Sequence, residues 1–344
     1  MYRHRPVLIL SSLILFVIVG VTLAAALGSV PIPLDQVVRM FLDQVPGFNL
    51  PQTWSEGEAT IILQIRLPRV MTSLIVGAAL ATAGVIFQGL LRNPMADPYI
   101  IGTSGGAALG ATVALLLPIR VFWFGFTLVP TFAFLGALVA VLVVYNIARV
   151  GARAPITTLL LAGFALSSML AAVMSFLMLL SGHTLRRVVL WIMGGVSASG
   201  WSQLSVVIPL ILVGMILAYL MAIDLNAFLL GEEQAASLGI QVERCKLILL
   251  MLGSLLTGAA VSVSGLVGFV GLVVPHMARL IFGPDHRLLL PTSALMGGLF
   301  LVLADMLARI VLSPSEVPVG IITALGGAPF FIYLLRRSKR EYVF

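Results

Sequence analysis

Nine long stretches of the chain contain no Asp, Glu, Lys or Arg, and this pattern restricts the possible folds more than any other feature. They are residues 6–34, 70–91, 98–119, 121–148, 154–185, 188–223, 247–278, 288–304 and 317–335. About 20 apolar residues cross a bilayer, so nearly all of these stretches can span one. Hydrophobic residues make up 60% of the chain and charged residues only 10%, which excludes a soluble or disordered protein of 344 residues. The sequence predicts an all-α integral membrane protein.

Basic residues at the two ends of the chain set its expected topology. They are Arg3, Arg5, Arg336, Arg337, Lys339 and Arg340. Because Lys and Arg stay on the cytoplasmic side, both termini are expected there, and the number of crossings must be even. The region 247–283 is too long for one helix and contains several glycines and Pro275. We therefore expect it to form two helices, about 246–264 and 268–282, which gives about ten helices in total.

A few arginines break this positive-inside pattern, because ten crossings place them outside. They are Arg39, Arg66, Arg69, Arg120, Arg186, Arg187 and Arg309. Residues 31–68 form the longest external segment and are too polar and proline-rich to span. Arg66 and Arg69 are expected just outside helix 2, and Arg309 at the outer end of helix 9. They could anchor the chain to lipid headgroups. Asp305 stands four residues before Arg309, so the two side chains are expected to pair.

An internal repeat relates the two halves of the chain. Ser73-Leu74-x-x-Gly77-Ala78-Ala79 recurs as Ser254-Leu255-x-x-Gly258-Ala259-Ala260, 181 residues later. Five helices separate the copies, so the second crosses in the opposite direction. Two inverted five-helix repeats are typical of transporters whose substrate path lies between the halves. The alternative is chance similarity between helices rich in Gly and Ala.

We treat residues 1–344 as a single polytopic domain. Residues 1–223 carry helices 1–6, residues 224–245 form a cytoplasmic loop, and residues 246–344 carry helices 7–10. Within the loop, Glu232 and Glu233 stand where their charge meets the positive end of a helix dipole, and Gly239 supplies a stop. A short amphipathic helix is expected, with an apolar surface able to lie in a partner's groove. An ordinary interhelical loop is the alternative.

Residue types that catalyse reactions or bind metals are sparse. The two lysines, Lys246 and Lys339, lie outside any phosphate-binding G-x-x-x-x-G-K-[ST] loop, so any ATP must be handled by a partner. Cys245 is the single cysteine, and His183 and His276 are isolated, so we assign no catalytic residue and no metal ligand. The scattered basic residues give no nucleic-acid surface.

Several motifs, in order along residues 60–335, resemble one family. They are Arg66-Leu67-Pro68-Arg69, Asn93-Pro94-Met95-Ala96-Asp97-Pro98, Gly231-Glu232-Glu233-Gln234-Ala235-Ala236-Ser237-Leu238-Gly239, Gly271-Leu272-Val273-Val274-Pro275-His276 and Asp305-Met306-Leu307-Ala308-Arg309. The chain resembles the permease subunits of type II ABC importers for iron-siderophore, haem and vitamin B12, the FecCD and BtuC-like permeases. The resemblance does not select one of these substrates.

The resemblance implies a multi-pass permease in a prokaryotic cytoplasmic (inner) membrane. It would move a bulky metal chelate inward by alternating access and would not itself be an enzyme. Its partners would be membrane lipid, a second permease copy or a related permease, two cytoplasmic ABC ATPases that hold ATP and Mg, and an extracytoplasmic substrate-binding protein. The chain itself would carry no cofactor.

The resemblance also assigns roles to particular residues. The coupling helix that receives the ATPase's motion would include Gly231, Glu232, Glu233, Gln234, Ala235, Ala236, Leu238 and Gly239. Arg66, Arg69 and Arg309 would dock onto acidic residues of the binding protein. Thr157 and Thr158, which otherwise read as caps at the start of helix 5, would narrow the cytoplasmic gate.

Two rival functions remain open at this point. An ion-coupled secondary transporter usually carries ionisable residues near the bilayer midplane, whereas Asp305 and Arg309 lie near the outer end of their helix. An intramembrane enzyme would need paired carboxylates, a metal cluster or an activated nucleophile.

Overall fold

The computed structural model describes residues 6–338, except residues 29, 48–49, 120–121, 124–125, 152 and 198–199. Some residues that guided the topology prediction lie outside the described residues: Arg3, Arg5, Arg120, Lys339 and Arg340.

The described chain is almost entirely helical. Its helices are α1 (Pro6–Ala26), α2 (Leu34–Asp43), α3 (Glu56–Thr60), a π-helical segment (Ile61–Arg66), α4 (Leu67–Leu90), α5 (Thr103–Leu116), α6 (Leu128–Ala148), α7 (Ile156–Leu180), a 3-10 turn (Gly182–Thr184), α8 (Leu185–Ile192), α9 (Trp201–Leu220), α10 (Ala222–Phe228), α11 (Glu232–Ser237), α12 (Val242–Ser264), α13 (Val270–Phe282), α14 (His286–Ile310) and α15 (Val319–Ser338). Strands β1 (Phe122–Trp123) and β2 (Phe126–Thr127) pair antiparallel.

Across the part of the chain that the structure describes, seven helices are long and apolar enough to cross a membrane. They are α1, the continuous helix Glu56–Leu90, α6, α7, α9, α12 and α14. Three shorter apolar helices, α5, α13 and most of α15, lie among them. The prediction of an all-α membrane protein with about ten helices is confirmed.

The break predicted within 247–283 lies between α12 and α13. Gly265 ends α12 with φ +62°, and Trp191 lies so close that a Cβ at Gly265 would collide with the Trp191 carbonyl. Only glycine fits both conditions easily. Phe269, also at positive φ, then opens α13. At 1.5 Å per residue, the 13 residues of α13 reach about 20 Å, which is less than the hydrocarbon thickness of a bilayer.

One boundary differs from the prediction. Helix 2 was expected to begin near residue 70, but the helix runs without interruption from Glu56 to Leu90. Its start is a capping box, in which the Ser55 hydroxyl accepts a hydrogen bond from the Glu58 N–H and the Glu58 carboxylate accepts one from the Ser55 N–H. Arg66 and Arg69 therefore lie inside a helix, not in an external loop.

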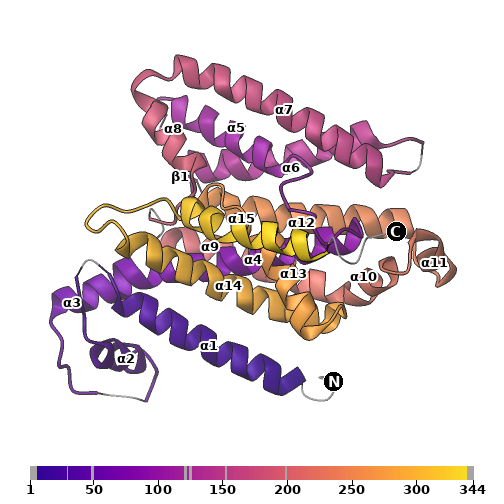
Figure 1. The fold of residues 1–344 in the computed structure, drawn as a ribbon. Helices are drawn as coiled ribbons and strands as arrows, with labels where there is room; N and C mark the ends of the chain where they lie inside the picture. The colour runs from indigo at the N-terminus through magenta and orange to yellow at the C-terminus, as the bar shows by residue number, and fades with distance from the viewer. Residues whose placement is uncertain are drawn as a thin grey trace.

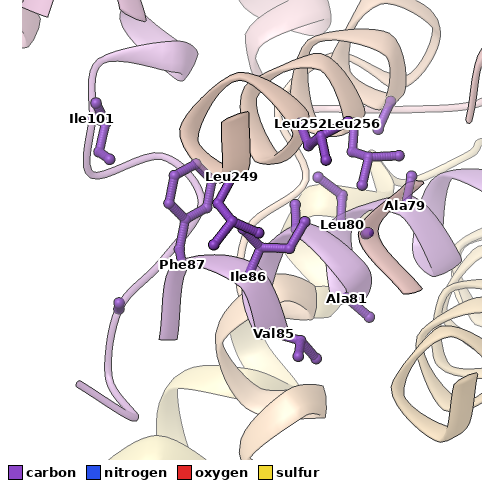
Figure 2. Close-up of a cluster of buried hydrophobic side chains, with 14 of the residues drawn as sticks. Ala79, Leu80, Ala81, Val85, Ile86, Phe87, Ile101, Leu249, Leu252 and Leu256 are labelled. Carbon is purple, nitrogen blue, oxygen red and sulfur yellow. The ribbon is translucent and has the colours of Figure 1, made fainter. Parts of the chain in front are cut away.

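Helix α4 lies at the centre of the bundle, and α12 and α14 pack along it (Figure 1). Figure 2 shows side chains of α4, among them Ile86 and Phe87, meeting Leu249 and Leu256 of α12. By contrast, α7 lies at the edge of the bundle with most of its length exposed. Since lipid is as apolar as these side chains, close packing and not hydrophobic burial holds such helices together.

Matched residues of the repeat pack against matched helices. Gly77 on α4 meets α14, where a Cβ at Gly77 would collide with the Gly297 carbonyl. Its counterpart Gly258 on α12 meets α6, where a Cβ would lie 3.2 Å from Ala137 Cβ. Helix α14 is the fourth apolar helix of the second repeat, after α9, α12 and α13, and α6 is the fourth of the first, after α1, α4 and α5. This exchange of partners supports the duplication.

The first residue of α1 and the last turn of α15 lie at the same end of the bundle as α10 and α11 (Figure 1). Helices α2, α3 and α8 lie at the opposite end. The placement of both termini and the 224–245 segment in the cytoplasm stays a prediction.

Candidate functional site: the face formed by α11

Glycines define both ends of α11. Gly231 precedes the helix at φ +117°, and Glu232 and Glu233 occupy its first turn. At the other end, Gly239 at φ +87° donates its N–H to the Ala236 carbonyl, and the next N–H bonds to the carbonyl of Ala235 (3.2 Å). This pair of bonds is a Schellman stop, which a residue in the left-handed conformation completes. The short helix predicted here is confirmed, as is its stop at Gly239.

The exposed face of α11 differs in one residue from the expected apolar surface. Ala235 is fully buried against the chain itself, so it cannot lie in a partner's groove, and the prediction for this side chain is wrong. The surface that faces outward includes Glu233, Gln234, Ala236 and Leu238, of which Leu238 is 65% exposed.

A buried lysine that the sequence reasoning missed fixes α11 to α12. The Lys246 Nζ atom lies 3.0 Å from Glu232 Oε1 and 3.1 Å from Glu243 Oε1, and Lys246 is 1% exposed. Nζ also donates to the carbonyl of Ala154 (3.2 Å), in the segment between α6 and α7. The available signal was a lysine three residues after a glutamate, at the start of a membrane helix.

A polar hollow of about 660 Å³ opens beside α11. Its lining comes from the end of α4, the α6–α7 segment, α11 and the start of α12, and comprises Arg92, Arg153, Gly231, Glu232, Glu233, Gln234, Ala236, Ile240, Val242 and Glu243. Both signs of charge line it, so it suits a polar segment of a partner protein better than an apolar ligand.

A second set of hydrogen bonds fixes the segment that precedes α11. The Asn226 side chain on α10 donates to Asp285 Oδ1 (2.8 Å) and accepts from the backbone N–H of His286 (2.9 Å). Asp285 is the N-cap of α14 and also accepts from the Arg287 N–H (3.0 Å). The Asn226 bond, followed by the Arg287 N–H, lowers the pKa of the Asp285 carboxyl below its usual 3.8. Helix α10 is thereby held to the α13–α14 turn.

The two predicted gate threonines lie in the first turn of α7, as expected. Thr157 is exposed. The Thr158 hydroxyl donates to the carbonyls of Pro155 (2.8 Å) and Ala148 (3.1 Å), so it joins the end of α6 to the start of α7. The gating role of both residues stays a prediction.

At the opposite end of the molecule, Arg66 and Arg309 bind the end of α1. Arg66 Nη1 donates to the carbonyls of Ala25 (2.9 Å) and Ala26 (2.8 Å), and Arg309 Nη2 donates to that of Ala24 (2.8 Å). Both arginines are 6% exposed. Cations at a helix C-terminus satisfy its free carbonyls and its dipole.

Asp305 joins this end of α4 to α14. Its fully buried carboxylate lies 2.9 Å from Arg69 Nη2 and 3.2 Å from Arg309 Nε. The predicted pairing of Asp305 with Arg309 is confirmed. Arg69, which is also buried, pairs with Glu316 as well (2.7 Å). The expectation that Arg66 and Arg69 stand outside their helix is therefore wrong, because carbonyls and carboxylates of the same chain enclose them. Arg309 lies in the last turn of α14, as predicted. The docking role of the three arginines stays a prediction.

Among the described residues, no group of three or more His, Cys, Asp or Glu side chains is arranged to hold a metal ion.

Comparison with known proteins links the chain to ABC transport. The FecCD transport family matches residues 14–337. An uncharacterised ABC transporter permease protein, YvrB of Bacillus subtilis, is 44% identical over 94% of this chain and 92% of its own length. The cobalamin import system permease protein BtuC of Halobacterium salinarum is 45% identical over 91% and 87% of the two chains. For the hemin transport system permease protein HmuU of Yersinia pestis the identity is 43% over 82% and 84%.

A solved structure supports the same relationship. An ABC transporter described as metal-chelate type, in an inward-facing conformation, superposes with a TM-score of 0.81 at 31% identity. The match covers 96% of this chain and 99% of the solved chain.

Proposed function

The chain belongs to the FecCD transport family, and we propose that it is the permease through which ATP hydrolysis on partner subunits drives a bulky metal chelate into a prokaryotic cell. Relatives named for cobalamin and hemin support a bulky metal chelate as cargo, and an iron-siderophore is also a bulky metal chelate. The chain would hold no cofactor, since ATP and Mg would be bound by the ATPase.

The observation that carries this proposal is the construction of the α11 face. A short helix with an exposed polar and apolar surface lies beside a charged hollow of about 660 Å³. Buried Lys246 attaches it to α12 and to the α6–α7 segment, and the hydrogen bonds of Asn226 attach the preceding helix, α10, to the start of α14. A surface held in this way can transmit force from a partner into the bundle. We assign α11 as the coupling helix, with Glu233, Gln234, Ala236 and Leu238 as its contact side chains.

The assembly would contain two permeases, two ATPases and one binding protein. The exposed apolar side of α7, with Phe164 at 74% and Leu179 at 81%, offers a surface for a second permease or for lipid. Both termini and α11 would face the cytoplasm, where the ATPases bind. Thr157 and Thr158, at that end of α7, would narrow the cytoplasmic gate.

The binding protein would dock at the opposite end, over the outer ends of α4 and α14. We propose that Arg66, Arg69 and Arg309 contribute to docking by fixing the shape of this end, because their guanidinium groups are already paired within the chain. Glu316, which is half-exposed and paired with Arg69, marks the edge of this surface.

Reconstitution tests this proposal against the ion-coupled alternative. The permease, its ATPase and its binding protein are placed in liposomes, and uptake of cobalamin, haem and a ferric siderophore is measured with ATP inside or outside, and with proton or sodium gradients. Uptake of one chelate that requires ATP on the ATPase side and is insensitive to ion gradients supports the proposal. Gradient-driven uptake without the ATPase would overturn it.

A further inference from the structure

Lys246 joins the helix that faces the partner to the helix that carries the expected gate. We propose that Lys246 is a positioning residue that transmits the displacement of α11 to the first turn of α7. The inference rests on the proposed function, because it takes α11 as the point where the ATPase acts. It adds a residue and a path that neither the motifs nor the comparisons assign.

The chemistry of the ammonium group explains why the segments would move together. A lysine ammonium has three N–H donors, and three acceptors lie within reach of this one: Glu232 at 3.0 Å, Glu243 at 3.1 Å and the Ala154 carbonyl at 3.2 Å. The group is buried, so water cannot replace a lost acceptor at low cost. Separating α11 from the α6–α7 segment would leave a buried charge with an unsatisfied donor.

Ala154, on the far side of this group, is held at both of its backbone atoms. Its carbonyl accepts from Lys246, and its N–H donates to Glu243 Oε2 (3.1 Å). The residue that follows is Pro155, the N-cap of α7, whose ring restricts φ. The Thr158 hydroxyl then bonds to the Pro155 carbonyl (2.8 Å). Because these bonds and the proline ring restrict the segment, a displacement of Ala154 moves the first turn of α7 with it.

The surroundings of α7 make such a displacement feasible. Its buried residues all lie on one side of its cytoplasmic half, and the rest of the helix is exposed or half-buried. A helix packed on one side can tilt without opening a cavity in the core. By contrast, α12, which carries Lys246, is mostly buried against α4, α6 and α9 and provides a fixed pivot.

The test compares Lys246→Met with a matched control in the complete reconstituted transporter. Methionine keeps an unbranched apolar side chain of nearly the same length and removes the charged ammonium group. The control is Arg244→Met, which removes an exposed positive charge two residues earlier on the same helix. The measured quantity is the number of substrate molecules imported per ATP hydrolysed.

We expect Lys246→Met to lower this ratio about tenfold while ATP hydrolysis continues, which lies within the range for the loss of a coupling contact. Arg244→Met should leave the ratio unchanged, and Lys246→Arg, which keeps a charged multi-donor group, should recover most of it. A purely structural lysine would instead reduce import and hydrolysis together, and a constant ratio would overturn the inference.

A second variant tests the same inference if Lys246→Met folds poorly. Glu232→Gln weakens only the contact between Lys246 and α11, at a carboxylate that is partly exposed. It should lower the number of substrate molecules imported per ATP about twofold. An unchanged ratio in this variant would also contradict the inference. The proposed function fails separately: if the unmodified complex imports nothing in response to ATP, the error lies in the proposed function and not in the role of Lys246.

Discussion

Removal of the Asp305 carboxylate should destabilise the permease more than removal of any exposed ion pair. Asp305 is fully buried and lies between Arg69 and Arg309, at 2.9 and 3.2 Å. Asp305→Asn keeps the size of the side chain but leaves buried Arg309 without an anion and leaves Arg69 with only Glu316. Removing one partner of a buried pair costs about 3–5 kcal/mol. For a chain of this length, that corresponds to a thermal midpoint lowered by on the order of 5 °C.

The matched control is Glu316→Gln, which breaks the other ion pair of Arg69. Glu316 is 45% exposed at its side chain, so water can replace its carboxylate, and the cost should be about 0–1 kcal/mol. Both variants are purified in lipid nanodiscs, and their midpoints are read from the temperature at which the monodisperse size-exclusion peak disappears. If Asp305→Asn shifts the midpoint no more than Glu316→Gln, the reasoning about this buried cluster is wrong.

Three further predictions concern packing, pH and topology. Gly77→Val should cost about 1–3 kcal/mol, because its side chain would meet the backbone of α14, and the thermal midpoint should fall accordingly. Asp285→Ala should cost about 1 kcal/mol at pH 7 through loss of the α14 cap. The folded pKa of Asp285 is below 3.8, so this stabilisation is present at neutral pH and is lost as the pH falls through that folded value. The midpoint difference from the unmodified protein should therefore shrink by pH 3, and a constant difference would contradict the charge argument. A cysteine at Gln234 should react with an impermeant thiol reagent only from the cytoplasm, and one at Gln52 only from outside. Labelling of both positions from the same side would contradict the predicted topology.

Sequence patterns sufficed for the features that depend on local chemistry. Membrane helices follow from runs without charge, and the break before α13 follows from Gly265 and its neighbours. The short helix α11 follows from Glu232, Glu233 and Gly239, whose effects act within one or two turns. The Asp305–Arg309 pair is likewise local, since four residues separate its members on one helix.

Features that depend on distant segments could not be predicted in the same way. Arg69 is paired with Asp305, which stands 236 residues later, and Arg66 bonds to carbonyls at the end of α1. With no partner visible nearby in the sequence, both arginines were expected outside the helix. The pairing of Lys246 with Glu243 is local, but its bond to the carbonyl of Ala154, 92 residues earlier, could not be predicted in this way.

The central claim is that force from the ATPase enters this permease at α11, and cross-linking measures this contact directly. Ala236, which is exposed, is replaced by cysteine in a Cys245→Ala background, and the ATPase carries cysteines along its permease-facing groove. We predict a cross-link whose yield changes when ATP is added, because α11 moves with its partner. If no position from 231 to 239 cross-links in a complex that still transports, the force enters elsewhere and the account is wrong.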